Sequence, residues 1–143
     1  MPVTVVVRPG ARAVADASLR RQAVARVRAA LAVVQRQRAS VALVFTDDGD
    51  IRGLNRRYRK IDRATDVLSF EGGAGELGDI VISVETARRQ ADRRRGGTRR
   101  ALGRELEVLA VHGLCHLLGH DHKRPAPARL MRSLERRLLR ASL

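Results

Sequence analysis

Aromatic side chains are nearly absent from this chain of 143 residues. It has no tryptophan, and its three aromatic residues are Phe45, Tyr58 and Phe70. A chain with so few rings offers few platforms for base stacking, so we expect any contact with nucleic acid to depend mainly on phosphate groups. There is also a single cysteine, Cys115, which agrees with a reducing compartment and excludes a framework of disulfides within the chain.

Long hydrophobic runs are missing as well. The apolar run VTVVV at residues 3–7 is far shorter than the roughly 20 residues of a membrane-spanning helix, and it does not have the form of a signal peptide. We therefore expect a cytoplasmic protein with no membrane partner. A length of 143 residues suits one compact domain covering residues 1–143, with a core that needs no disulfides.

Lysine is scarce although the chain is strongly basic. The net charge is +14, and all but two of the 29 basic residues are arginines, the lysines being Lys60 and Lys123. This charge points to an anionic partner such as RNA, although arginine-rich composition also follows from a GC-rich genome and from solvated helix faces. Eight arginines fall between Arg88 and Arg104, immediately before the only histidines, and should place a positive field beside them.

All four histidines lie in the segment HGLCHLLGHDH at residues 112–122. His112 and His116 are one helical turn apart, so both imidazoles face the same side of a helix and can bind one ion. Gly119 lets the chain leave that helix and bring His122 back to the same ion. Three imidazoles leave one tetrahedral position open, which is typical of a catalytic zinc site, so we expect one zinc ion per chain.

Several residues of this segment have other possible roles. The histidines could be ordinary residues of a half-buried helix, but their concentration here, and Asp121 as a group that could orient a ligand, favour a metal site. Gly113 stands where a zincin protease has its glutamate base, so peptide hydrolysis by that route is not expected. We expect Cys115 to be a small core side chain. His120 could compete as a ligand, although the helix should end before it.

Three sequence blocks together resemble the YbeY endoribonucleases of bacterial ribosome maturation. The histidine segment resembles the family signature HGxLHLxGYDH, LNRRYRKIDRATDVLSF from Leu54 to Phe70 resembles LNxxYRxxDxPTDVLSF, and LGDIVIS from Leu77 to Ser83 resembles a third block. The blocks occur in the family's order, and with the flanking helices they cover most of the chain. The departures are a short link between the second and third blocks and three substitutions, at Ala64, Cys115 and His120.

The resemblance implies a zinc-dependent endoribonuclease that is specific for single-stranded RNA. Its expected roles are maturation of the 3′ end of small-subunit (16S) ribosomal RNA and late ribosome quality control, with ribosomal RNA and the small ribosomal subunit as partners and no DNA. Metal ligands would be His112, His116 and His122. Arg59 would be the catalytic residue, because a guanidinium can bind a scissile phosphate through two hydrogen bonds. The resemblance aside, Arg59 is one solvated arginine among many.

Two questions stay open at this stage. The nucleophile could be a metal-bound water or a ribose hydroxyl. The alternative function is a non-catalytic ribosome-associated RNA-binding protein with a structural zinc, against which the open fourth position argues. A hydrolase of small phosphoesters or peptides is a further alternative, which the density of arginines disfavours.

Periodicity predicts an α+β fold, with a small four-stranded mixed sheet packed against about five helices and a metal site on a helix and the turn after it. Strands are predicted at residues 3–8, 41–46, 66–70 and 77–83. Helices are predicted at 16–38, from the Asp47–Gly49 cluster through Tyr58, after Ser83, at 100–118, and in a final helix that buries Leu130, Leu134 and Leu138. Arg59 should lie in the turn after the second helix.

Overall fold

Four strands form one mixed sheet in a computed structural model, which describes residues 3–119 and 125–143. The strands run in the order β1-β2-β4-β3, with β1 and β4 parallel to β2 and the edge strand β3 antiparallel to β4. Their bounds are β1 Val3–Val7, β2 Ser40–Thr46, β3 Val67–Glu71 and β4 Glu76–Ser83. The parallel pairs require crossover connections, which the helices provide.

The helices are α1 Ala17–Val33, α2 Asp48–Arg59, α3 Val84–Arg95, α4 Arg99–Leu117 and α5 Pro125–Arg140, preceded by the short turn η1 Pro9–Ala11. Four of them begin with a side-chain cap that accepts a backbone N–H of the first turn: Asp16, Asp47, Ser83 and Thr98. The predicted α+β class with a four-stranded mixed sheet and five helices is confirmed. Within the described residues, no helix is both long and apolar enough to cross a membrane.

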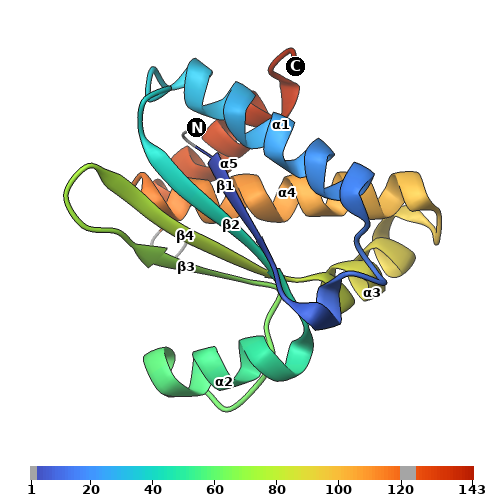
Figure 1. The fold of residues 1–143 in the computed structure, drawn as a ribbon. Helices are drawn as coiled ribbons and strands as arrows, with labels where there is room; N and C mark the ends of the chain where they lie inside the picture. Colours follow the sequence, from blue (N-terminus) through green and yellow to red (C-terminus); the bar gives the residue numbers. More distant parts are fainter. Residues whose placement is uncertain (1–2, 120–124) are drawn as a thin grey trace.

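The sheet separates two hydrophobic layers of unequal size. Helices α1 and α4 lie over one face with α5 packed against both of them, while α2 lies on the other face (Figure 1). Alternation along β4 serves both layers, since Ile80 and Ile82 enter the large core and Val81 joins Ile51 and Leu68 beneath α2. The histidine helix α4 therefore packs on one face of β3 and β4, and α2 packs on the opposite face.

Two predicted details are wrong. Helix α1 ends at Val33 rather than at residue 38, because Gln35 takes a left-handed conformation (φ 59°) that no α-helix continues. Leu130 does not face the core, since its side chain is 64% exposed, whereas Met131 and Leu138 are fully buried. At 100° per residue, the buried stripe of α5 is rotated by about one residue from the predicted one.

A buried ion pair ties α1 to α4. The Arg26 Nε donates to Glu107 Oε1 at 2.7 Å, and the Gln22 amide donates to the other oxygen of the same carboxylate at 2.7 Å. Arg26 also donates to the backbone carbonyls of Leu138 and Ala141 at the C-terminal end of α5. One guanidinium thus connects the three helices of the large layer and sets their relative positions.

A second polar cluster joins α2 to α3. One Asp48 carboxylate oxygen accepts hydrogen bonds from the hydroxyls of Ser83 and Thr86, both at 2.6 Å, and the other accepts one from Arg89 at 2.8 Å. Partial burial opposes ionisation of Asp48, but these three donors outweigh it and lower the pKa of the carboxyl below its ordinary value. The first turn of α2 is therefore anchored to the first turn of α3.

Candidate functional site

The two histidines of the HxxxH pattern face each other at the C-terminal end of α4. Both are half-buried, and their Nε2 atoms lie 3.2 Å apart, with ring planes at 77° to each other. In a tetrahedral zinc site with Zn–N distances of about 2.0–2.1 Å, two ligand nitrogens lie about 3.3–3.4 Å apart. The distance between the Nε2 atoms of His112 and His116 is therefore close to that between two ligands of such a site.

Glu135 of α5 lies behind the first of these histidines. Its Oε2 is 3.1 Å from His112 Nδ1, and its side chain is 16% exposed. A carboxylate on the outer nitrogen is typical of metal-binding histidine, because it holds the proton on Nδ1 and turns the Nε2 lone pair towards the metal. Sequence reasoning named Asp121 for such a role and missed Glu135. The available signal was a carboxylate on the face of α5 that carries Met131 and Leu138.

The third predicted ligand, His122, lies outside the described residues, as do His120 and Asp121. In the part of the chain that the structure describes, there is no group of three or more His, Cys, Asp or Glu residues that could hold a metal. Gly119 has φ 95° and its N–H bonds to the His116 carbonyl. The chain thus leaves α4 at the glycine, as predicted.

Cys115 is completely buried in the large core. Burial, with a smaller contribution from the charge of Glu135, raises the pKa of its thiol to about 12. The side chain is therefore a protonated core residue, as its position in the sequence predicts.

Gly113 lies between His112 and His116 in α4 and lets the helix pack closely on the sheet. A Cβ at this position would lie 2.6 Å from Ile80 Cγ2 and 3.0 Å from Ser69 Oγ, so no larger residue fits. The same close approach lets Ser69 Oγ donate a hydrogen bond of 2.9 Å to the Gly113 carbonyl. Packing on β3 and β4 thus requires glycine where a zincin protease has glutamate.

Arg59 approaches the same stretch of β3 from the other side of the sheet. It is the last residue of α2 rather than part of the following turn, since the helix ends at Lys60, which takes a left-handed conformation (φ 63°). Its Nη2 donates to the Ser69 carbonyl at 2.7 Å, and its guanidinium carbon lies 5.0 Å from the centre of the Phe70 ring. Ser69 therefore contacts both predicted parts of the site, Arg59 through its backbone and α4 through its side chain.

Comparison with known proteins assigns the family. A family model described as "Endoribonuclease YbeY" matches residues 11–142. The chain belongs to the YbeY family. It is 47% identical over 121 residues to the Endoribonuclease YbeY of Anaeromyxobacter sp. (strain Fw109-5), a match that covers 81% of this chain and 61% of that protein. With the protein of the same name from Pelotomaculum thermopropionicum it is 46% identical over 113 residues, 72% of either chain.

The matches differ in how much of each relative they cover and in what they show. The chain spans about six tenths of the length of the two Anaeromyxobacter relatives that it matches. Among solved structures, it is similar to the solution structure of TM1509 from Thermotoga maritima, with a TM-score of 0.64 and 20% identity over 96% of this chain and 86% of that one. At that identity, the likeness supports the α+β fold alone.

The arginine cluster of this YbeY-family chain is not beside the histidines. Its members lie on α3 and at the start of α4, and five of them are paired with Asp16, Asp48, Glu105 or Glu107. At 1.5 Å per residue, the turn from Arg99 to Arg104 is about 12–20 Å along α4 from His112. The predicted field beside the histidines is therefore wrong, because neighbours in sequence are separated by the length of the helix.

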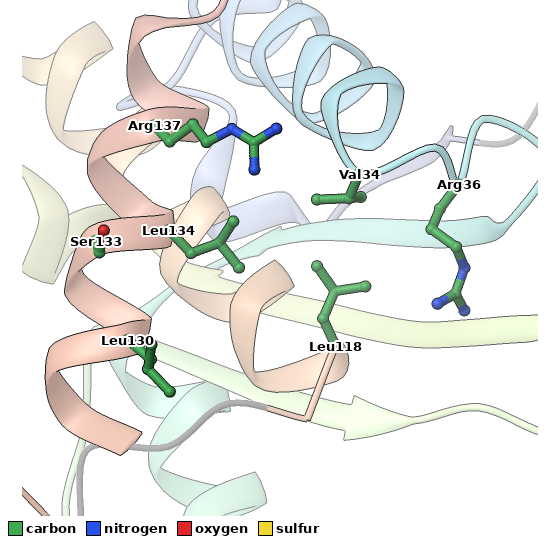
Figure 2. Close-up of a pocket in the computed structure, with 7 residues that line it drawn as sticks. All are labelled: Val34, Arg36, Leu118, Leu130, Ser133, Leu134 and Arg137. Atoms are coloured by element: carbon green, nitrogen blue, oxygen red, sulfur yellow. The ribbon is translucent and has the colours of Figure 1, made fainter. Parts of the chain in front are cut away.

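An open pocket of about 420 Å³ lies elsewhere, between α5 and the C-terminal ends of α1 and α4. Figure 2 shows Leu118, Leu130 and Leu134 on its apolar side with two arginines near its rim. Its lining residues are Val34, Arg36, Leu118, Leu130, Ser133, Leu134 and Arg137. Neither histidine of the pair, nor Arg59, lines this pocket, so it is separate from the candidate site.

Proposed function

We propose that this YbeY-family chain is a zinc-dependent endoribonuclease that cleaves single-stranded RNA. In the same proposal it is cytoplasmic and acts in maturation of the 3′ end of small-subunit (16S) ribosomal RNA and in late ribosome quality control. The relatives it matches carry the name Endoribonuclease YbeY. The observation that carries the proposal is the pair of Nε2 atoms 3.2 Å apart on the helix that Ser69 connects to Arg59.

Zinc would be held by His112, His116 and His122, with Glu135 orienting the first of them through its Nδ1. Imidazole nitrogens suit zinc, and a carboxylate on the far nitrogen of one ring is a common support for such a ligand. When bound, zinc supplies a Lewis acid that polarises a phosphodiester and favours attack on it. The nucleophile would be a water molecule or the adjacent ribose hydroxyl.

Arg59 would bind the scissile phosphate. A guanidinium carries five N–H donors, so the one that binds the Ser69 carbonyl leaves others for two phosphate oxygens. The Arg59 side chain is exposed, and its backbone belongs to the last turn of α2. This position suits a side chain that contacts an RNA strand from the solvent side. As negative charge develops on the phosphate, these hydrogen bonds strengthen, so the side chain stabilises the transition state more than the bound substrate.

The decisive experiment compares RNA cleavage by zinc-loaded protein, metal-stripped protein, metal-stripped protein with zinc restored, and Arg59→Ala. We expect activity to disappear and return with zinc. Arg59→Ala should keep its zinc and bind RNA within a few-fold of wild type, yet lose roughly a hundredfold or more in single-turnover rate. Arg59→Lys should recover only part, because an ammonium cannot make the two-pronged contact.

The results also separate the alternatives. If Arg59→Ala weakens binding but leaves the rate at saturating protein unchanged, Arg59 is only a phosphate anchor. If zinc-loaded wild type binds RNA but never cleaves it, the protein is an RNA-binding protein with structural zinc. Cleavage of a 16S precursor at its 3′ junction, in free RNA and in small subunits, tests the ribosomal role separately.

Metal analysis of variants tests the ligand set. Replacing His112, His116 or His122 by alanine should each remove most of the zinc. His120→Tyr and Cys115→Ala serve as matched controls from the same segment and should retain about one zinc per chain. Loss of zinc from either control would contradict the assignment.

A further inference from the structure

Two of the three aromatic residues of the chain pack against each other beside Arg59. The rings of Tyr58 and Phe70 have centroids 5.3 Å apart and planes at 69°, an edge-to-face contact. Phe70 is half-buried beneath α2, but Tyr58 is 54% exposed. The contact with Phe70 holds the exposed Tyr58 ring in one orientation. Tyr58 therefore offers an ordered apolar surface that a ligand can contact.

Two guanidinium groups lie over these rings. The Arg57 guanidinium carbon is 5.9 Å from the centre of the Tyr58 ring, and that of Arg59 is 5.0 Å from the centre of the Phe70 ring. Both arginines are exposed, and within residues 3–119 and 125–143 neither forms an ion pair with a carboxylate. We call the cluster of Arg57, Tyr58, Arg59 and Phe70 the Tyr58 platform. It combines a ring face with positive charge that nothing in the described chain neutralises.

We infer that the Tyr58 platform stacks one unpaired base of the RNA beside the scissile phosphate. The inference rests on the proposed function, because Arg59 is both a member of the platform and the expected phosphate ligand. Arg59 donates a hydrogen bond to the Ser69 carbonyl on β3. The Ser69 hydroxyl in turn donates to the Gly113 carbonyl on α4, the helix that carries the histidine pair. A base on Tyr58 would thus belong to a nucleotide flanking the phosphate that Arg59 binds.

Magnitudes favour a base over the guanidinium as the partner of the Tyr58 ring. A base stacked on an aromatic side chain contributes roughly 5- to 150-fold in affinity, whereas a guanidinium over an exposed ring contributes only about two- to fivefold. An arriving base therefore displaces Arg57 from the ring, and the released guanidinium can bind a phosphate oxygen instead. The platform needs no other conformational change.

Stacking of this kind selects for single strands. Bases in a duplex are covered by their neighbours on both faces, so only an unpaired base can place a face on Tyr58. Every base has such a face, so the selection does not depend on base identity. The expectation that recognition depends mainly on phosphate contacts stays a prediction, to which the Tyr58 platform would add one stacking contact.

The test measures affinity of the zinc-loaded protein for a short fluorescent single-stranded RNA and for a fully paired duplex of the same length. Anisotropy is read immediately after mixing, with single-turnover cleavage followed in parallel. Tyr58→Leu should weaken single-strand binding about 5- to 150-fold, leave duplex binding nearly unchanged and keep the salt dependence, because no ionic contact is lost. Tyr58→Phe should bind like wild type. Val6→Ala, an exposed apolar residue on the opposite edge strand β1, is the matched control.

Single-strand affinity of Tyr58→Leu equal to that of wild type would overturn the inference, as would an equal loss of affinity for single strand and duplex. A second measurement does not depend on the folding of a variant. Abasic sites placed one at a time along the RNA should reveal one position at which the affinity of the wild-type protein falls; no such position would also overturn it. If RNA binding depends on Tyr58 but no cleavage occurs, the Tyr58 platform is supported and the proposed enzymatic function is contradicted. If RNA is cleaved but neither binding nor cleavage depends on Tyr58, the enzymatic function is supported and the Tyr58 platform is contradicted.

Discussion

Gly113→Ala tests whether the close approach of α4 to the sheet sets the geometry of the site. The added Cβ would lie 2.6 Å from the Cγ2 of Ile80, which is about 1 Å inside ordinary carbon–carbon contact. Ile80 is fully buried and β-branched, so it cannot rotate away. The added methyl must therefore push α4 and the sheet apart.

The expected magnitude is the difference of two opposing effects. Overpacking of this kind costs about 1–3 kcal/mol, while replacing glycine by alanine inside a helix contributes about 1 kcal/mol of stability. We expect a net loss of up to about 2 kcal/mol, or a fall in Tm of several degrees for a chain of this size. Gly53→Ala in α2 is the matched control, because its Cβ meets nothing within 4 Å, and it should stabilise the protein slightly.

The same shift should disturb function. It would lengthen the 2.9 Å bond from Ser69 to the Gly113 carbonyl and move His112 relative to Arg59. Because a displacement of about 1 Å can cost roughly a hundredfold in rate, Gly113→Ala should lose cleavage by about 10- to 100-fold while keeping its zinc. Urea melts, metal analysis and single-turnover rates measure the three effects. If Gly113→Ala matches Gly53→Ala in stability and wild type in rate, the argument from packing fails.

Three further predictions follow from contacts between helices. Glu135→Gln should weaken zinc binding about 10- to 100-fold by removing the charge behind His112, as metal titration would show; unchanged affinity would mean that the contact has no influence on the metal. Arg26→Leu leaves Glu107 buried without its main partner and should cost about 3–5 kcal/mol in urea melts, and a loss below 1 kcal/mol would contradict this. The pKa of Asp48 is lowered by folding, so its ionised form stabilises the protein above pH 3.8 and this contribution is lost as the pH falls below that value. The stability difference between wild type and Asp48→Asn should therefore be largest near neutral pH and shrink in acid, and a difference that grows in acid would refute it.

Features that depend on near neighbours in the chain were predictable. Periodicity predicted all four strands, and polar residues marked the starts of α2 at Asp47 and of α3 at Ser83. Errors arose where the deciding contact lies outside the local window. Leu130 and Met131 are equally apolar neighbours, and only the position of α5 against α1 and α4 decided which of them is buried.

The candidate site divides in the same way. His112 and His116 face each other because four residues make one helical turn, which is a property of the chain itself. The contacts of Glu135 with His112, of Ser69 with Gly113 and of Tyr58 with Phe70 join residues on different elements. The spacing of residues along the sequence does not predict distances between residues on different elements.

The sequence alone therefore determined which residues could carry the chemistry, because motif spacing and residue type are local. It also determined the strong positive charge, but not where that charge acts. Only the packing of α2 and α4 on opposite faces of one sheet decided that Arg59 and Ser69 meet at the edge strand, while the arginines of α3 lie at the far end of α4. Distance along a chain becomes distance in space only after rigid helices and strands have packed, since each helical residue adds a fixed rise and each sheet brings remote strands together.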